Sequence, residues 1–297
     1  MPNKPRIAVL LAAYQGIQWI EEQVSSILVQ EAVEVTLFIS VDACAPGVEE
    51  DGTLVWCQQL AEHNKQVYLL PYGQQFGGAG ANFFRMIEDV DLSPFDAMAF
   101  ADQDDIWLPQ KLARAWQVID QAQYHVYSSN VIAFWPDGRE QLIKKSYPQK
   151  RFDHLFEAAG PGCTYVFSQK AVKALQGFVR QNTEALRKVS LHDWFAYAYC
   201  REQGFSWFID EQAWMKYRQH ASNQVGVNQG VRAYYKRMIQ VLNKSYRSQV
   251  ECISELVAPQ LAREFAKFGV RVWSFFQCRR RPRDQLALLM MFILGMY

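Results

Sequence analysis

Three carboxylates within four residues form the densest group of potential ligands in the sequence, in Asp102-Gln103-Asp104-Asp105. Like charges this close raise one another's pKa, and a bound cation is the simplest way to keep all three ionised. Oxygen ligands favour Mg²⁺ or Mn²⁺, and Mg²⁺ is commonly shared between one or two carboxylates and substrate phosphates. Alternatively, Asp104 or Asp105 caps a helix that begins near Pro109. The segment therefore predicts either a divalent-metal site or an acidic helix cap.

Two later segments carry groups that suit such a site. Asp193 lies at the start of an aromatic segment expected to be helical, where a carboxylate either caps the helix or serves as a general base across a cleft from the metal. Arg218 and His220 end a short expected strand. A guanidinium binds phosphate oxygens in a bidentate fork and an imidazole can ligate a cation, although such pairs are also common on surfaces. Together they indicate a diphosphate and its metal as possible ligands.

A sheet with helices on both faces is the expected scaffold. Short apolar runs alternate with segments of helical periodicity, which is typical of a mostly parallel sheet. The expected strands are 7–13, 35–41, 67–70 and 97–101, and the expected helices are 17–30, 53–62 and 81–90. Ligands of such sheets bind beyond the carboxyl ends of the strands. Asp42, which follows the second strand, is therefore a candidate to bind a nucleobase or ribose, although a turn-forming role is equally compatible.

The second half of the chain is expected to be less regular. A β-rich stretch at 124–135 ends in a turn at 136–138, and Gly160-Pro161-Gly162 breaks the chain before a strand at 163–167 and a helix from Ser168. From about Gly230 the pattern predicts long helices, at 231–257 and 260–277, separated by Pro259.

Composition excludes several classes of protein. Half of the 297 residues are hydrophobic, which excludes disorder and allows a sizeable core. The 31 Lys and Arg balance 30 Asp and Glu, too evenly for a protein whose whole surface binds nucleic acid. The six cysteines are far apart and form no zinc-finger or disulfide pattern, as expected in a reducing, cytoplasmic compartment.

Taken in order, the motifs resemble glycosyltransferase family 2, and within it the bacterial rhamnosyltransferases of cell-surface polysaccharide and lipopolysaccharide assembly. The matching segments are Leu11-Ala12-Ala13-Tyr14-Gln15-Gly16, 21–30, Asp42, Asn82-Phe83, 102–107, His192-Asp193-Trp194 and Tyr217-Arg218-Gln219-His220. The likeness spans residues 6 to about 226 and departs from the family pattern at Val41-Asp42-Ala43-Cys44, where Asp-Asp-Gly-Ser is usual. It implies an α/β GT-A fold, a nucleotide-diphosphate sugar donor such as dTDP-rhamnose, and inversion at the anomeric carbon.

The resemblance also implies a domain plan and a role for each matching residue. Residues 1–226 would form the GT-A domain, with 1–110 as the nucleotide-sugar half and 111–226 as the acceptor half, and 227–297 would be a helical extension. Asp193 would be the catalytic base, and Asp104 and His220 would hold Mg²⁺ or Mn²⁺. Donor contacts would come from Ala13, Tyr14, Asp42, Asn82, Asp102, Gln103 and Arg218, and acceptor-side contacts from His192, Trp194, Asp105 and Trp107.

The C-terminal tail combines aromatic, basic and apolar residues. Trp273, Phe275 and Phe276 precede the basic segment 279–283 and an apolar run at 286–297, which is too short to span a bilayer. Such a tail can bind the anionic inner face of the cytoplasmic membrane, which suits a lipid-linked or lipopolysaccharide saccharide acceptor. Alternatively, it packs on the protein or on a second copy in a homo-oligomer. Two other functions stay open: transfer of another hexose from a UDP-sugar, and a catalytically inactive carbohydrate-binding homologue.

Overall fold

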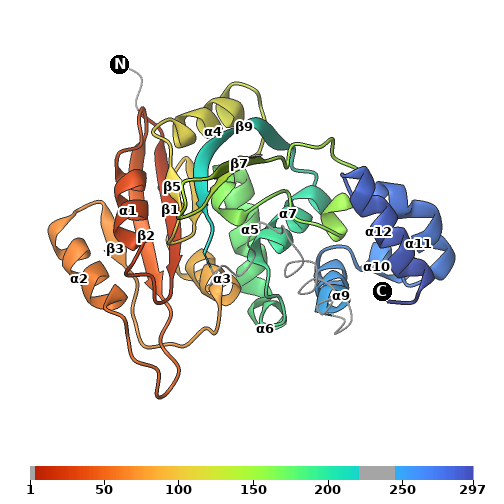
Figure 1. Ribbon diagram of the computed structural model, residues 1–297, viewed down its shortest axis with the longest axis horizontal. Helices are drawn as coiled ribbons and strands as arrows, with labels where there is room; N and C mark the ends of the chain where they lie inside the picture. The colour runs from red at the N-terminus through yellow and green to blue at the C-terminus, as the bar shows by residue number, and fades with distance from the viewer. Residues whose placement is uncertain (1–3, 221–244, 297) are drawn as a thin grey trace.

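One mixed β-sheet organises the protein, with strands in the order β3-β2-β1-β4-β8-β6-β9-β5 and β7 paired with β6 (Figure 1). The structure is a computed structural model, and it describes residues 4–220 and 245–296. Two expectations fall outside the described residues: the domain boundary at 226 and the first part of the helix expected at 231–257. The same is true of 221–226, a run of small and polar residues that the sequence predicts to be a loop after the strand.

The first half of the sheet is parallel, as the alternating pattern predicts. It contains β1 (Arg6–Ala13), β2 (Glu34–Val41), β3 (Val67–Leu69) and β4 (Ala97–Ala101). Every residue of β1 after Arg6 is buried, because helices cover both faces of the sheet. The register pairs Leu11 with both Ile39 and Ala101, so the carboxyl ends of these strands lie at one edge. The intervening helices are α1 (Ile20–Leu28), α2 (Thr53–His63) and α3 (Ala79–Asp89).

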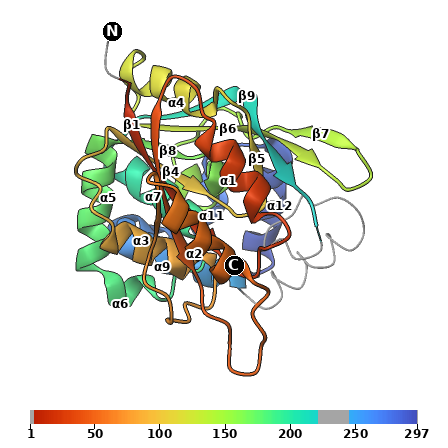
Figure 2. The same cartoon turned by 90° about the vertical axis from the view of Figure 1, so that its left-hand side faces the viewer.

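The second half of the sheet mixes directions. β8 (Val166–Ser168) is antiparallel to both β4 and β6 (Val126–Phe134), whereas β9 (Trp207–Arg218) runs parallel to β6. β5 (Ile106–Trp107) pairs with β9, and β7 (Glu140–Ile143) forms a hairpin with β6 that extends to one side of the molecule (Figure 2). Two expectations were wrong here. The strand expected at 163–167 begins later, because Gly162–Thr164 forms a 3₁₀ turn, η2, and the strand expected to be short before His220 has twelve residues.

Helices of the second half pack on this sheet and on α3. They are α4 (Lys111–Asp120), α5 (Gln169–Gln181), α6 (Thr183–Leu186) and α7 (His192–Glu202). The Ser168 side chain accepts a hydrogen bond from the Ala171 N–H, so the helix expected from this residue begins with a Ser cap. The start of α7 also lies close to α3: a β-carbon on Gly80 would be 2.3 Å from the Ser190 carbonyl oxygen.

The C-terminal helices pack at the end of the molecule opposite α2 (Figure 1). They are α9 (Ser245–Val257), α10 (Pro259–Phe265), α11 (Phe268–Ser274) and α12 (Pro282–Ile293), with a 3₁₀ turn, η3 (Phe275–Gln277), before α12. Pro259 separates α9 from α10 as predicted, but the single helix expected at 260–277 is broken. Among the described residues, no helix combines the length and hydropathy needed to cross a bilayer.

Candidate active site

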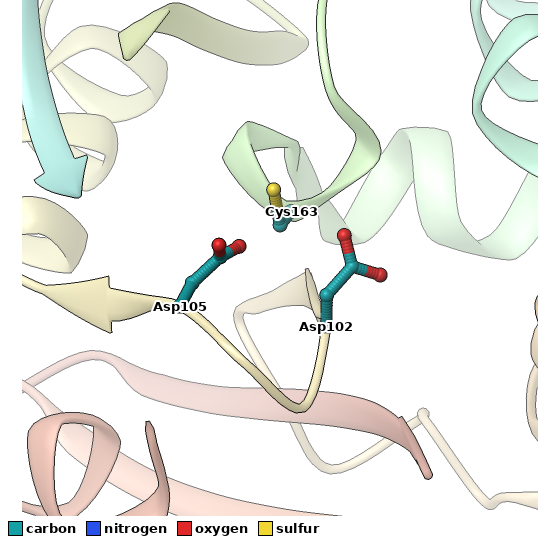
Figure 3. Close-up of side chains that lie close together, drawn as sticks. All are labelled: Asp102, Asp105 and Cys163. Atoms are coloured by element: carbon teal, nitrogen blue, oxygen red, sulfur yellow. The ribbon is translucent and has the colours of Figure 1, made fainter. Parts of the chain in front are cut away.

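The loop after β4 places two carboxylates beside a cysteine. The potential ligand atoms of Asp102, Asp105 and Cys163 lie within 4.8 Å of one another (Figure 3). Burial, reinforced by Asp104, raises the pKa of Asp102 to about 7 and that of Asp105 well above its usual range. Cys163, in η2, stays a thiol, because burial and the two carboxylates raise its pKa well above normal. Keeping this many acids ionised in one place requires compensating positive charge.

Part of that charge is already built into the core, on the buried side of the cluster. Lys111 and Asp105 are both 0% exposed, and the Lys111 Nζ lies 3.4 Å from the centre of the Trp107 ring. Burial lowers the pKa of Lys111 to about 7, while Cys163 and Asp105 oppose that shift. The Asp105 carboxylate also accepts a hydrogen bond of 3.2 Å from the Arg218 N–H. Asp105 and Trp107 therefore support the loop from inside, and their burial argues against the acceptor-side contact expected for them.

Asp104 lies next to Arg218 and His220 on the other side of the loop, although more than a hundred residues separate Asp104 from these two in sequence. His220 Nε2 lies 2.6 Å from an Asp104 carboxylate oxygen, and the Arg218 Nε–H donates to the Asp104 carbonyl oxygen at 2.8 Å. Residues of α1 and of the loop before it hold Arg218 and His220 in place. Glu22 forms an ion pair with Arg218, and the Trp19 ring stacks on His220 with 4.0 Å between ring centres. The two residues predicted to hold a metal are thus adjacent.

This region fits a divalent cation. Asp102 and Asp104 follow directly from β4, and the second oxygen of buried Asp105 has no hydrogen-bond partner among residues 4–220 and 245–296. Carboxylate oxygens and an imidazole are ligands that Mg²⁺ and Mn²⁺ accept, whereas a thiol suits softer metals. Because Lys111 already compensates Asp105 and Cys163 is a neutral thiol, the Asp102, Asp104 and His220 side of the loop is better suited to the ion.

The loop after β1 is tied to the same acidic loop. The Tyr14 N–H donates to the Gln103 side-chain oxygen at 2.8 Å, and the Gln103 amide donates back to the Tyr14 carbonyl at 2.9 Å. Gly16 is required here, because a β-carbon would lie 2.2 Å from the Gln103 side chain. Buried Ala13 contributes its carbonyl, which accepts the Asp42 N–H at 2.8 Å. Tyr14 itself remains exposed beside Gln103.

The carboxylate of Asp42 is engaged by the backbone. It accepts hydrogen bonds from the N–H groups of Phe76, Gly77 and Gly78, at 2.6, 3.0 and 3.2 Å. Asn82 is 1% exposed and donates to the Ser40 carbonyl at 2.9 Å. Asp42 thus holds the segment before α3, and Asn82 holds α3 itself, at the carboxyl end of β2. Direct contact with a nucleotide stays a prediction for Asp42, and burial argues against it for Asn82.

Asp193 meets the acidic loop through the turn that carries Cys163. A β-carbon on Gly162 would lie 3.0 Å from the Asp193 Cβ, so the first turn of α7 packs directly on η2. Burial and the neighbouring Asp104 are the main causes of the raised pKa of Asp102, and the negative charge of Asp193 adds to them. Burial raises the pKa of Asp193 to about 6, and the Trp194 N–H donates to its carboxylate at 2.7 Å. Asp193 and the acidic loop therefore lie near the same turn, and the role of Asp193 as the base stays a prediction.

His192 and Trp194 anchor this turn rather than line its open side. The His192 ring stacks on Phe83 with 3.9 Å between centres, and burial lowers its pKa to about 3, so the ring is neutral. Trp194 is buried, and its indole N–H donates to the His154 carbonyl at 2.9 Å. These contacts give both residues a supporting role, and the acceptor-side contact expected for them stays a prediction.

Sequence reasoning missed four side chains that the structure places at the site: Trp19, Glu22, Lys111 and Cys163. The Gly160-Pro161-Gly162 segment before Cys163 was interpreted only as a chain break, although a small-residue turn is also where two backbones can approach closely. Lys111 gave no signal at all, since a lysine at the start of a helix is usually exposed.

Comparisons with known proteins agree with this geometry. The sequence profile described as "Glycosyltransferase like family 2" matches residues 5–236. The dTDP-rhamnosyl transferase RfbG of Shigella flexneri is 40% identical over 294 residues, which cover 97% of this chain and 100% of RfbG.

Two solved structures share the fold at low sequence identity. TarS of S. aureus, in complex with UDP-GlcNAc, has a TM-score of 0.53 and 13% identity, and the match covers 96% of this chain and 84% of that one. The mannosyltransferase PcManGT of Pyrobaculum calidifontis, in complex with GDP-Man and Mn²⁺, has a TM-score of 0.54 and 15% identity, with 100% and 82% covered. The predicted GT-A fold is therefore confirmed, and the chain belongs to the glycosyltransferase family 2-like proteins and is a glycosyltransferase.

Proposed function

We propose that the enzyme is an inverting, metal-dependent rhamnosyltransferase that moves L-rhamnose from dTDP-rhamnose to a lipid-linked or lipopolysaccharide saccharide. The observation that carries the chemistry is the convergence of Asp193 and the Asp102–Asp105 loop on η2. The donor is inferred from the 40% identity to a dTDP-rhamnosyl transferase along the whole of both chains.

The leaving diphosphate would be held by the Asp104, His220 and Arg218 group. A Mg²⁺ or Mn²⁺ ion bound by Asp104 and His220, with Asp102 beside them, would supply charge that stabilises the departing diphosphate. The Arg218 guanidinium is suited to phosphate oxygens and is at present paired with Glu22, a carboxylate that a diphosphate could replace. Tyr14 and Gln103, tied together by two hydrogen bonds, would border the donor at the end of β1.

Asp193 would remove the proton from the acceptor hydroxyl. General base catalysis of this kind is typically worth about 10²–10⁴-fold. With a pKa of about 6, the carboxylate is ionised at neutral pH and still basic enough to accept a proton. The acceptor oxygen attacks the anomeric carbon as the bond to the diphosphate breaks, so the sugar is transferred in one displacement with inversion.

A panel of nucleotide sugars tests the donor assignment. Thermal stabilisation and transfer would be measured for dTDP-rhamnose, UDP-GlcNAc, UDP-glucose and GDP-mannose, each with Mn²⁺ and with Mg²⁺. Saturating ligand is expected to stabilise the protein by about 2–4 kcal/mol, and dTDP-rhamnose is expected to do so at the lowest concentration. Preferential stabilisation by a UDP-sugar would replace the donor assignment, and stabilisation without any transfer would favour an inactive carbohydrate-binding homologue.

The C-terminal helices supply a surface for the acceptor's membrane. Trp273 is 82% exposed, and further exposed apolar side chains lie on η3 and α12: Phe276, Leu286, Met290, Ile293 and Leu294. The basic segment is only partly available, which corrects the expectation for it. Arg280 is buried against Asp153 and Glu157, and Arg279 also pairs with Glu157. Arg283 remains exposed beside the apolar side chains and fits an anionic lipid headgroup.

We infer that this surface holds the enzyme on the inner face of the cytoplasmic membrane. Truncating the tail would be a poor test, because Leu288 and Phe292 of α12 belong to the core. A Trp273→Ser, Leu286→Ser double variant should instead lose binding to vesicles containing phosphatidylglycerol while keeping its thermal stability. Tyr68→Ser, an exposed position on β3, is the matched control. Unchanged vesicle binding together with loss of a dimer would assign the surface to a homo-oligomer.

A further inference from the structure

The segment after β7 carries Lys145 to the side of the site where Asp193 lies. The Lys145 N–H donates to the Asn130 side-chain oxygen at 2.6 Å, and the Ser146 N–H donates to the same oxygen at 3.0 Å. Asn130 is buried on β6, and its amide nitrogen donates to the Glu211 carbonyl at 2.7 Å. The backbone at Lys145 is therefore fixed to two strands of the sheet.

Its side chain reaches the site along the Gly160–Gly162 turn. A β-carbon on Gly160 would lie 3.3 Å from the Lys145 Cγ, so the lysine stem packs on a position where a side chain would push it away. Two residues later, a β-carbon on Gly162 would lie 3.0 Å from the Asp193 Cβ. Since two residues span at most about 7 Å, the stem of Lys145 and the base candidate contact one short turn. The positive charge of Lys145 favours the ionised form of Asp193 and lowers its pKa against the effect of burial.

Three other titratable groups near Asp193, all within the part of the chain that the structure describes, supply no positive charge. Asp102, from the loop after β4, is acidic and repels it. His192, its neighbour on α7, is kept neutral by burial, which lowers its pKa to about 3. Tyr165, which follows η2, stays protonated because burial raises its pKa well above normal. A carboxylate in this setting needs a cation nearby to remain a usable base.

We propose that Lys145 is a positioning residue for the catalytic base: the ammonium group of this side chain, whose stem packs on Gly160, stabilises the negative charge on Asp193 while the acceptor hydroxyl is deprotonated. This inference rests on the proposed role of Asp193.

The test compares Lys145→Met, which keeps the apolar stem, with Lys145→Arg, which keeps the charge. For Lys145→Met, the acid limb of the kcat profile should move up by about one pH unit, giving about a 5-fold loss at pH 6 and almost no loss at pH 8.5. Lys145→Arg should restore most of the activity at pH 6. Lys144→Met is the matched control, because the Lys144 ammonium lies over the Tyr147 ring, 5.3 Å from its centre, and should leave the profile unchanged.

A loss of equal size at every pH, or an unchanged profile, would overturn the proposal. Should Lys145→Met fail to fold, Lys145→Gln provides the same comparison. Carbon-13 NMR titration of the Asp193 carboxyl group, assigned with Asp193→Asn, gives a readout that needs no substrate. An upward shift of that carboxyl pKa in Lys145→Met would support the coupling even if the donor or the acceptor assignment failed, and no shift would refute it.

Discussion

Replacing Gly162 with alanine tests how closely the base is tied to the acidic loop. The new methyl group would lie 2.9 Å from the His192 Nε2 and 3.0 Å from the Asp193 Cβ. Carbon atoms in contact are normally about 3.5–4.0 Å apart, so the start of α7 must move away by roughly 0.5 Å. Overpacking of this kind costs about 1–3 kcal/mol, which corresponds to a fall in Tm of several degrees.

The effect on turnover should exceed the effect on stability. A misplacement of 1 Å can cost about 10²-fold in rate, so a shift about half as large should lower kcat on the order of 10-fold. Donor affinity, measured by calorimetry with dTDP-rhamnose and Mn²⁺, should change less than about threefold, which is a cost of less than about 0.7 kcal/mol. Asp104, His220 and Arg218 lie on the other side of the loop, away from the new methyl group.

Gly177→Ala provides the matched control. Gly177 lies within α5, and a β-carbon there would have no neighbour within 4 Å. Removing a helix glycine should stabilise the protein by about 0.5–1 kcal/mol and leave kcat unchanged. If Gly162→Ala turned over donor as fast as the wild type, or if it lost donor affinity in proportion to kcat, the contact between η2 and Asp193 would not be what positions the base.

Three further predictions follow from charge. Removing divalent metal with EDTA should abolish transfer, and adding Mn²⁺ or Mg²⁺ should restore it; full activity in EDTA would refute the role given to Asp104 and His220. Arg218→Lys keeps a positive charge but loses the Nε donor to the Asp104 carbonyl, so it should weaken donor binding by about 1.5–3 kcal/mol in calorimetry, and unchanged affinity would exclude Arg218 from the diphosphate. The pKa of Asp193 is raised to about 6 from an ordinary 3.8, so the folded state binds this proton more tightly than the unfolded state does. The contribution of this group to the free energy of unfolding is therefore largest below about pH 4 and is lost as the pH rises through 6. Asp193→Asn should remove about 3 kcal/mol of that loss in denaturant unfolding between pH 4 and pH 7.5, and an identical pH dependence in both proteins would contradict the burial of this carboxylate.

The first half of the fold, through β4, follows from local patterns. Strands such as β1 are uniformly apolar because both faces are covered, and the helices between them begin and end within a few residues of the expected positions. Such signals are local, so sequence alone carries them. The Asp102–Asp105 loop was also predictable, because three carboxylates at the end of a buried strand have few explanations.

The second half of the fold depends on tertiary contacts that leave little trace in sequence. The 3₁₀ turn at Gly162 displaces the start of β8, and the packing of Gly162 against α7 is what brings Asp193 to the loop. Burial decided the remaining roles. Asp105 and Trp107 belong to the same motif as Asp104, yet their side chains are buried in the core, where the charge of Lys111 compensates the Asp105 carboxylate. No residue pattern distinguishes a buried member of an acidic motif from an exposed one.

Transfer by Asp193→Asn is the most direct test of the proposed catalytic centre. The substitution keeps the acceptor for the Trp194 N–H and removes only the capacity to take a proton. We predict that the variant binds dTDP-rhamnose with Mn²⁺ within about threefold of the wild type, which is a change of less than about 0.7 kcal/mol. Its transfer rate should fall at least about 100-fold, as for loss of a general base. Transfer at the wild-type rate would contradict the claim that acids from two distant segments of this chain work together on one bound sugar nucleotide.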